Sequence, residues 1–487
     1  MAENFHTLWQ KTQIGMFWNA FEKIAIQGIS FGLGIVLARL LTPHDYGTIG
    51  MLIIFLTFSN VFIDSGFSRA LIQKQDRTEE DFSTVLIFNI VVSCLLYIIL
   101  FFASPAIADF YETPELVGLQ RVFFIIIIIN SLSVVQSAKL QIKVDFKSIA
   151  LINALSTIVS GSIAIYAAYQ GAGPWALVIQ AIINAVVSTV SYWIVGKWMP
   201  KTGFSKASFK RLFGFGSKLL ACGVLSTTVS NIYNFIIGKY FNPASLGYYT
   251  RAQQFPEITA GTLNSVLINS TFPLMATLQD QNSELITTFK KLIKLSALVV
   301  FPAMLGLALL SEDLIDVLLG EQWLPAADFL FWIALSYMFV PLSALNLNLL
   351  NAIGRSDLFM KIDFSKVPIV FATMAITFPI SLKAVVIGKA ATAIIYYYMN
   401  TFMLGRLYGF GMLKQLAHIW KCIVSSIVMG GIVFGITFYI ESTWLSLIVG
   451  VVSGITVYST MLLILKEEEC EFYINKVKQI FYRHNNE

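Results

Sequence analysis

Cations inside long apolar stretches are the side chains of this 487-residue sequence that could do chemistry. Lys23, Arg69 and Arg251 each lie in such a stretch. A cation in the hydrocarbon of a bilayer costs several kcal/mol, so each is expected to face a wet interior or a counter-ion. Cations in a wet interior suit an anionic ligand, above all a phosphate, because charge-assisted hydrogen bonds to phosphate are strong. The sequence therefore predicts that these three side chains bind an anionic substrate.

Acidic side chains accompany these cations along the chain. Glu22, Asp64 and Glu257 are the embedded acids nearest to them in sequence, and they are candidate counter-ions or ion-coupling groups. The alternative for each cation is a charge that is merely paired or that snorkels to the membrane surface. Snorkelling is the strongest alternative to substrate binding at Arg69, because this residue lies about one turn from the expected end of its helix.

The sequence offers little for catalysis, for a metal or for a cofactor. No HExxH, GxxxxGK[ST] or GxSxG motif occurs, and all four histidines lie outside the apolar stretches, at His6, His44, His418 and His484. The four cysteines have no CxxC spacing, so neither a disulfide framework nor a zinc site is indicated. We therefore predict a protein that is not an enzyme and that binds no metal or cofactor.

The elements that position the charged side chains are membrane spans. Hydrophobic residues make up 56% of the chain and charged residues only 13%, unlike a soluble protein. A bilayer core about 30 Å thick needs roughly 20 helical residues to cross it. The apolar stretches predict an all-α membrane protein with fourteen spans, at residues 15–41, 47–72, 82–103, 119–138, 148–169, 174–196, 213–240, 248–278, 292–310, 329–350, 367–382, 384–404, 422–440 and 444–465.

The distribution of lysine and arginine predicts the orientation of these spans. Alternate connections are basic, as in residues 197–211, whereas the opposite connections carry acids such as Asp109, Glu112 and Glu115. By the positive-inside rule, the basic connections and both termini are cytoplasmic. These loops also account for the net charge of +5, so no nucleic-acid partner is predicted.

The chain repeats itself at an offset of 200 residues. Residues 39–47 match residues 239–247, with a cation, a proline and a glycine in register. An even number of spans separates the copies, so both halves have one orientation, a plan in which the substrate site lies between two lobes. The predicted domains are six-helix lobes at 1–200 and 201–404, an amphipathic cytoplasmic connection at 405–421, two additional spans at 422–465 and a cytoplasmic tail at 466–487.

Two motifs resemble those of a known family. Residues 37–47 read LARLLTPHDYG, which is similar to the LARLLxPxDYG signature of the Wzx-type flippases of lipid-linked oligosaccharides in the MOP superfamily. Residues 237–252 read IGKYFNPASLGYYTRA and are similar to that family's IGRxxGPxxLGxYxRA. The resemblance implies a V-shaped bundle of two six-helix lobes plus two C-terminal helices, with Lys23 and Arg251 at cationic positions of the family. Asn231 and Asn234 depart from it, because relatives often carry a charge there.

The resemblance also implies a function. The protein would flip an undecaprenyl-diphosphate-linked oligosaccharide from the cytoplasmic to the outer leaflet of the bacterial inner membrane, by alternating access. Its partners would be that lipid-linked oligosaccharide, membrane lipids and other polysaccharide-assembly proteins. A MATE-like small-molecule exporter is one alternative, which would favour embedded acids over cations. An integral-membrane polysaccharide polymerase or ligase is another, which the short outer connections disfavour.

The predicted orientation can be tested with single cysteines. In a background without cysteine, a cysteine at Glu115 is expected to react with a membrane-impermeant thiol reagent in intact cells, because its connection is predicted to be outside. A cysteine at Ser205 should react only after the cells are opened. Labelling of position 205 from outside would contradict the orientation.

Overall fold

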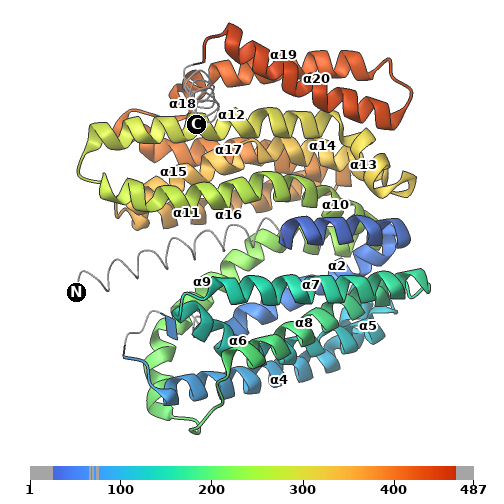
Figure 1. Ribbon diagram of the computed structural model, residues 1–487, viewed down its shortest axis with the longest axis vertical. Coiled ribbons are helices and arrows are strands. Elements are labelled where there is room, and N and C mark those ends of the chain that lie inside the picture. Colours follow the sequence, from blue (N-terminus) through green and yellow to red (C-terminus); the bar gives the residue numbers. More distant parts are fainter. Residues whose placement is uncertain (1–25, 65–66, 68–70, 73–75, 468–487) are drawn as a thin grey trace, which may run out of the picture. The chain divides into compact units, whose positions relative to one another are not determined.

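The computed structural model describes residues 26–64, 67, 71–72 and 76–467, and every regular element among them is a helix (Figure 1). Ten helical segments in this part of the chain are long and apolar enough to cross a membrane. The prediction of an all-helical, multi-pass membrane protein is therefore confirmed. The count of fourteen stays a prediction, because four further helical segments fall short of that length or composition: Ile26–Leu40, α9 (Lys206–Tyr240), α10 (Pro243–Pro256) with α11 (Thr262–Thr277), and α16 (Ser356–Thr377).

The contacts divide the chain into two compact units, Met1–Thr250 and Arg251–Glu487. The division falls within α10. It comes later than residue 200 because α9 packs along α2 (Pro43–Asp64) of the first unit. The division into six-helix lobes, which follows from the span count, stays a prediction.

In the first unit, α4, α6, α7 and α8 pack side by side (Figure 1). Between α2 and α9, the helices of this unit are α4 (Glu79–Phe110), α5 (Leu116–Phe123), α6 (Ile125–Ile142), α7 (Phe146–Tyr169) and α8 (Pro174–Gly196). A capping box starts α4, where the Thr78 amide donates to the Asp81 carboxylate at 2.9 Å. The fully buried Asp81 also pairs with Arg211 of α9 at 2.7 Å. One buried carboxylate therefore both starts α4 and holds α9 against it.

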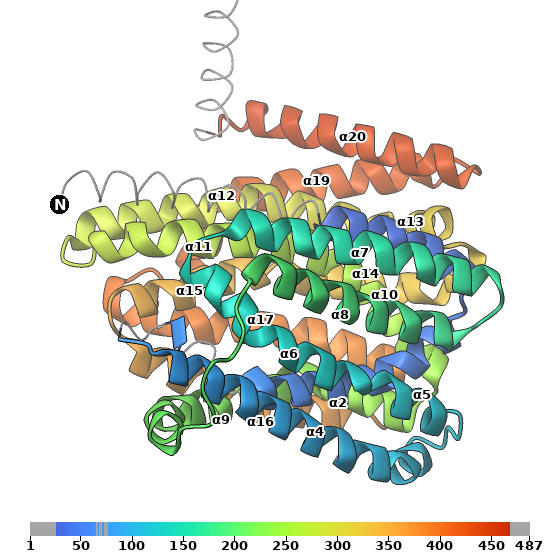
Figure 2. The same ribbon diagram turned by 60° about the horizontal axis from the view of Figure 1, so that its bottom comes forward.

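In the second unit, α12 (Asn282–Leu309) packs against α14, α15 and α19. The other elements are the π-helix Glu257–Gly261, α13 (Ser311–Leu319), the 3-10 helix Glu321–Trp323, α14 (Pro325–Tyr337), α15 (Val340–Ala352), α17 (Leu382–Tyr408), α18 (Met412–His418), α19 (Trp420–Thr437) and α20 (Thr443–Ile464). The core around α12 includes Phe289, Ile293 and Tyr397, each fully buried. Figures 1 and 2 show α19 and α20 side by side as a pair at the edge of this unit.

The predicted spans differ from the helices mainly by interruptions. The span at 119–138 is broken at Phe124, between α5 and α6. The span at 329–350 is broken at residues 338–339, ahead of Pro341, which has no amide hydrogen to continue a helix. The short turn expected near residue 382 does separate α16 from α17, and the Ser381 hydroxyl caps α17 by accepting from the Ala384 amide at 3.0 Å.

The amphipathic connection predicted at 405–421 contains α18, which a buried glutamine holds in place. The Gln415 side chain donates to Asn346 at 2.7 Å and to the Phe410 carbonyl at 3.1 Å. Its oxygen accepts from the Tyr397 hydroxyl at 2.8 Å. Gln415, Asn346 and Tyr397 are completely buried. Because each member has partners, the network fixes α18 to α15 and α17 rather than costing stability.

The two repeated turns start helices in the same way. Pro43 and Pro243 are the first residues of α2 and α10, where a missing amide hydrogen costs nothing. Thr42 accepts from the Asp45 amide at 3.3 Å, and Asn242 accepts from the Ser245 amide at 2.7 Å. The repeat in the sequence is therefore a repeat of one helix-capping device.

These two helix starts lie in direct backbone contact. A Cβ atom added to Gly47 would lie 1.6 Å from the carbonyl oxygen of Pro243, and one added to Gly247 would lie 2.0 Å from that of Pro43. Only glycine permits this approach. The contact is reciprocal, as expected for two copies of one motif that face each other about a local twofold axis.

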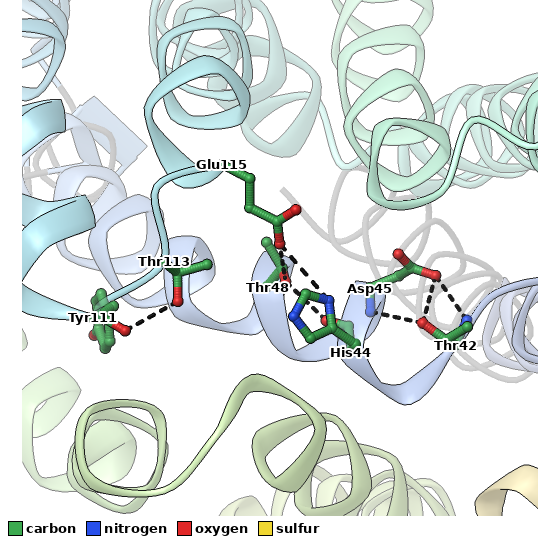
Figure 3. A network of polar contacts seen from close by, with 7 residues as sticks. All are labelled: Thr42, His44, Asp45, Thr48, Tyr111, Thr113 and Glu115. Atoms are coloured by element: carbon green, nitrogen blue, oxygen red, sulfur yellow. Dashed lines mark hydrogen bonds and ion pairs between the residues drawn. The ribbon is translucent and has the colours of Figure 1, made fainter.

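A polar network surrounds the contact (Figure 3). The Thr48 hydroxyl donates to Glu115 at 3.1 Å, and His44 Nδ1 lies 3.7 Å from the same carboxylate. On the side of the second turn, Lys239 Nζ lies 3.2 Å from Glu112. The connection between α4 and α5 is thus bound to both repeated turns.

We predict that Gly47→Ala and Gly247→Ala each destabilise the protein severely, by at least about 3 kcal/mol, because the methyl group would overlap a backbone carbonyl that no side-chain rotation can move away. The measurements are abundance in the membrane and the thermal unfolding midpoint in detergent. Gly32→Ala is the matched control, since nothing lies within 4 Å of a Cβ at that position. Normal stability of both turn variants would rule out the close contact.

Gln415→Leu is predicted to lower stability by about 2–3 kcal/mol, because it leaves buried polar groups of Asn346, Tyr397 and Phe410 without a partner. The same thermal unfolding measurement tests this. Gln141→Leu is the control, because the Gln141 side chain is exposed and bonds only weakly, to Ser137 at 3.3 Å. Equal unfolding midpoints for the two variants would contradict the role of the network.

Candidate anion-binding site

Arg251 is the cation of the predicted site that the structure describes. It lies on α10 at the start of the second unit and is half-buried. Its guanidinium donates to the side-chain oxygen of Gln254, one turn further along. This contact leaves the planar guanidinium able to engage a second acceptor, because it carries five N–H donors.

The other predicted site residues are described only in part. Lys23, Glu22 and Arg69 lie outside the described residues. Asp64 is the last residue of α2, and its side chain is not among those described. Glu257 is exposed and is the first residue of the π-helix. The convergence of Lys23, Arg69 and Arg251 on one ligand therefore stays a prediction.

Four polar side chains that could not be brought together from the sequence alone lie close to one another within the second unit. Lys389, in the first third of α17, donates from Nζ to the side-chain oxygen of Gln253 at 3.1 Å. Glu257 is close enough to interact electrostatically with Lys389 and with Tyr337 of α14. Gln253, Glu257, Tyr337 and Lys389 thus form one cluster, which we call the Lys389 cluster. It combines the Lys389 cation with the neutral side chains of Gln253 and Tyr337 and with the Glu257 carboxylate as a counter-ion.

The signal for this cluster was present in the sequence. Gln253 and Glu257 are four residues apart, and side chains at that spacing lie on the same face of a helix. Lys389 is a cation inside an apolar span, so it needs polar surroundings. What the sequence could not supply was the packing of α17 against the segment that carries Gln253.

The backbone changes its winding where the cluster begins. Pro256 has no amide hydrogen, so the helical hydrogen bond to the Ala252 carbonyl cannot form. The following five residues, Glu257–Gly261, form a π-helix before α11 continues the chain. Single π-helical turns are frequent at functional sites, because they change which face of the helix the side chains occupy.

Two other cations of the described helices, Lys383 and Arg121, have local partners. Lys383, six residues before Lys389 on α17, pairs with the exposed Asp328 at 2.8 Å. Arg121 donates to the Ser104 hydroxyl at 3.0 Å and lies over the Phe101 ring at 4.5 Å. These contacts, an exposed ion pair and a contact with a hydroxyl and an aromatic ring, are typical of a structural role. The environment of Lys389 differs from that of Lys383 and Arg121.

Comparison with known proteins identifies the chain. Residues 36–328 match the model of the family described as "Polysaccharide biosynthesis protein". The chain is 29% identical over 346 residues to the teichuronic acid biosynthesis protein TuaB of Bacillus subtilis, which covers 71% of this chain and 72% of that protein. It is 23% identical to the lipopolysaccharide biosynthesis protein WzxC of Escherichia coli, over 65% of each chain.

The fold has a known counterpart. The structure of the lipid II flippase MurJ in an inward closed conformation matches with a TM-score of 0.74 and 15% identity, over 93% of this chain and 98% of that chain. At this identity the match speaks for the fold alone. By the family match over residues 36–328, the chain belongs to the polysaccharide biosynthesis protein family, and its multi-pass membrane fold is like that of MurJ.

Proposed function

We propose that the protein flips an undecaprenyl-diphosphate-linked oligosaccharide from the cytoplasmic to the outer leaflet of the bacterial inner membrane, by alternating access, for the synthesis of a surface or exported polysaccharide. Both termini are cytoplasmic in this proposal. The family membership and the names of the relatives support a transporter rather than an enzyme. The structural observation that carries the proposal is the Lys389 cluster, in which a cation of an apolar helix is accompanied by the neutral Gln253 and Tyr337 and by the Glu257 carboxylate.

The polar end of such a substrate is a diphosphate. Arg251 can engage two phosphate oxygens with its planar fork, whereas Lys389 supplies a compact charge. Lys23 and Arg69 are proposed to add further cationic contacts, with Glu22, Asp64 and Glu257 as counter-ions or coupling groups. The contacts should be few and partly hydrated, because a transported ligand has to leave.

The other end of the substrate is an isoprenoid chain. A cavity of about 470 Å³ opens among α12, α19 and α20, and its lining is almost entirely apolar. Leu298, Pro302, Met429 and Tyr458 contribute to this lining, and Gly306 has no side chain to fill the cavity. Such a cavity supports a lipid-linked substrate, since a water-soluble solute gains little from an apolar wall.

The test is export of polysaccharide by variants in a strain that lacks the native gene. Lys389→Ala is expected to slow export roughly tenfold to hundredfold, the cost of losing a charged hydrogen bond. Lys383→Ala is the matched control, with the same change on the same helix but outside the cluster. Arg251→Ala should abolish export and Arg251→Lys retain part of it. Lys23→Ala should be impaired and Lys23→Arg tolerated.

Each variant is compared at equal abundance in the membrane, so that a folding defect is not counted as a transport defect. Full export by the double variant Lys23→Ala, Arg251→Ala would show that these charges are structural. Full export by Lys389→Ala would remove the Lys389 cluster from the proposal. An intact lipid-linked precursor that accumulates in the cytoplasmic leaflet would distinguish failed flipping from failed synthesis.

A further inference from the structure

A second cationic cavity lies where α17 meets α18, away from the Lys389 cluster. It has a volume of about 530 Å³. The residues that matter for its chemistry are Tyr398, Phe402, Arg406, Leu413 and Lys414. Arg406 is in the last turn of α17, and Lys414 is in α18. Two cations and several apolar side chains therefore line the same cavity.

The backbone around the cavity is closely packed. Gly409 ends α17 with a φ of 66°, a conformation that glycine adopts without strain. A Cβ atom on Gly405 would lie 3.1 Å from the Cα atom of Gly411, so the chain doubles back tightly. The buried Gln415 holds α18 from its other face. The two cations are thus presented from fixed elements.

No carboxylate of the described residues neutralises either cation. Among the described residues, Arg406 and Lys414 form no ion pair with a carboxylate, although Arg406 lies over the Phe402 ring at 4.9 Å. Other basic residues of this unit do have acidic partners, such as Arg355 with Asp357 at 2.9 Å. Two exposed, unneutralised charges beside one cavity favour an anionic ligand, and a phosphate in particular.

The position along α17 indicates the depth of the cavity in the membrane. The 27 residues of α17 extend about 40 Å, whereas the hydrocarbon core is about 30 Å thick. The last turn of α17 therefore lies at the level of the lipid headgroups. Tyr398 and Phe402, 54% and 39% exposed, precede Arg406 by eight and four residues and so lie on the same face of the helix. An aromatic strip thus leads from the hydrocarbon to the two charges.

We propose that this cavity binds an anionic phospholipid, whose headgroup phosphate contacts Arg406 and Lys414 and whose acyl chain lies along Phe402 and Tyr398. The aromatic strip and the 82% exposed Leu413 favour a lipid over a free phosphate ion, which has no use for an apolar surface. The lipid would hold the α17–α18 corner at the membrane surface. This site is independent of the transported substrate.

Thermal unfolding of the purified full-length chain in a zwitterionic detergent tests the proposal. Added phosphatidylglycerol is expected to raise the unfolding midpoint more than phosphatidylcholine, because a ligand that binds the folded state stabilises it. The double variant Arg406→Gln, Lys414→Gln should weaken the apparent affinity for phosphatidylglycerol about tenfold or more. The charge-conserving variant Arg406→Lys, Lys414→Arg should keep most of it, which separates loss of charge from misfolding.

The control variant is Arg355→Gln, Lys361→Gln, which likewise removes one arginine and one lysine, here from the N-terminal part of α16. It should respond to phosphatidylglycerol like the wild type. An equal response to both lipids by the wild type, or an unchanged response by the Arg406, Lys414 double variant, would overturn the proposal. Stabilisation by inorganic phosphate or pyrophosphate that matches phosphatidylglycerol would show a phosphate site rather than a lipid site, and would also overturn it.

Discussion

Hydrocarbon offers no hydrogen bonds, so each polar group that the chain carries into the membrane has to be satisfied by the chain itself. The same demand applies to polar side chains that are buried by protein at the ends of the spans, such as Asp81 and Glu467. Asp81 is completely buried and is satisfied by Arg211 and by the start of α4. Glu467, also buried, pairs with Lys294 of α12 and lies 3.9 Å from Lys421 of α19. Such pairs join helices that are distant in the sequence, and they do so at points where apolar packing alone would permit sliding.

The same constraint explains what the sequence could and could not predict. Spans such as 174–196 coincide with α8 because apolar length alone decides them. The interruptions at Phe124 and at residues 338–339 were not predicted, because a helix that breaks inside a protein keeps its apolar composition. The role of Gln415 was invisible for a different reason. A glutamine in a basic, amphipathic stretch is typical of an exposed surface, and only its distant partners, Asn346 and Tyr397, make it a core residue.

In the candidate site, too, the features that depend on local sequence could be predicted, and those that depend on tertiary packing could not. The sequence singled out embedded cations because their cost is a property of one residue and its neighbours. It singled out Glu257 but could not join it to Lys389, because their proximity depends on how α17 packs in the second unit. The π-helix after Pro256 also escaped prediction, since the proline indicates a disturbed helix without specifying which form the disturbance takes.

The reciprocal contact between Gly47 and Gly247 has a consequence for chimaeric proteins. Each glycine is required by the backbone of the other repeat, at the carbonyl of Pro243 or Pro43, rather than by its own helix. Exchanging one half of the chain for the corresponding half of a relative would therefore succeed only if the incoming half supplies both a glycine and a proline turn of the same length. An insertion of a single residue between the proline and the glycine of either copy would misalign both glycine–carbonyl contacts at once. At this junction the two repeats can therefore be altered only as a pair.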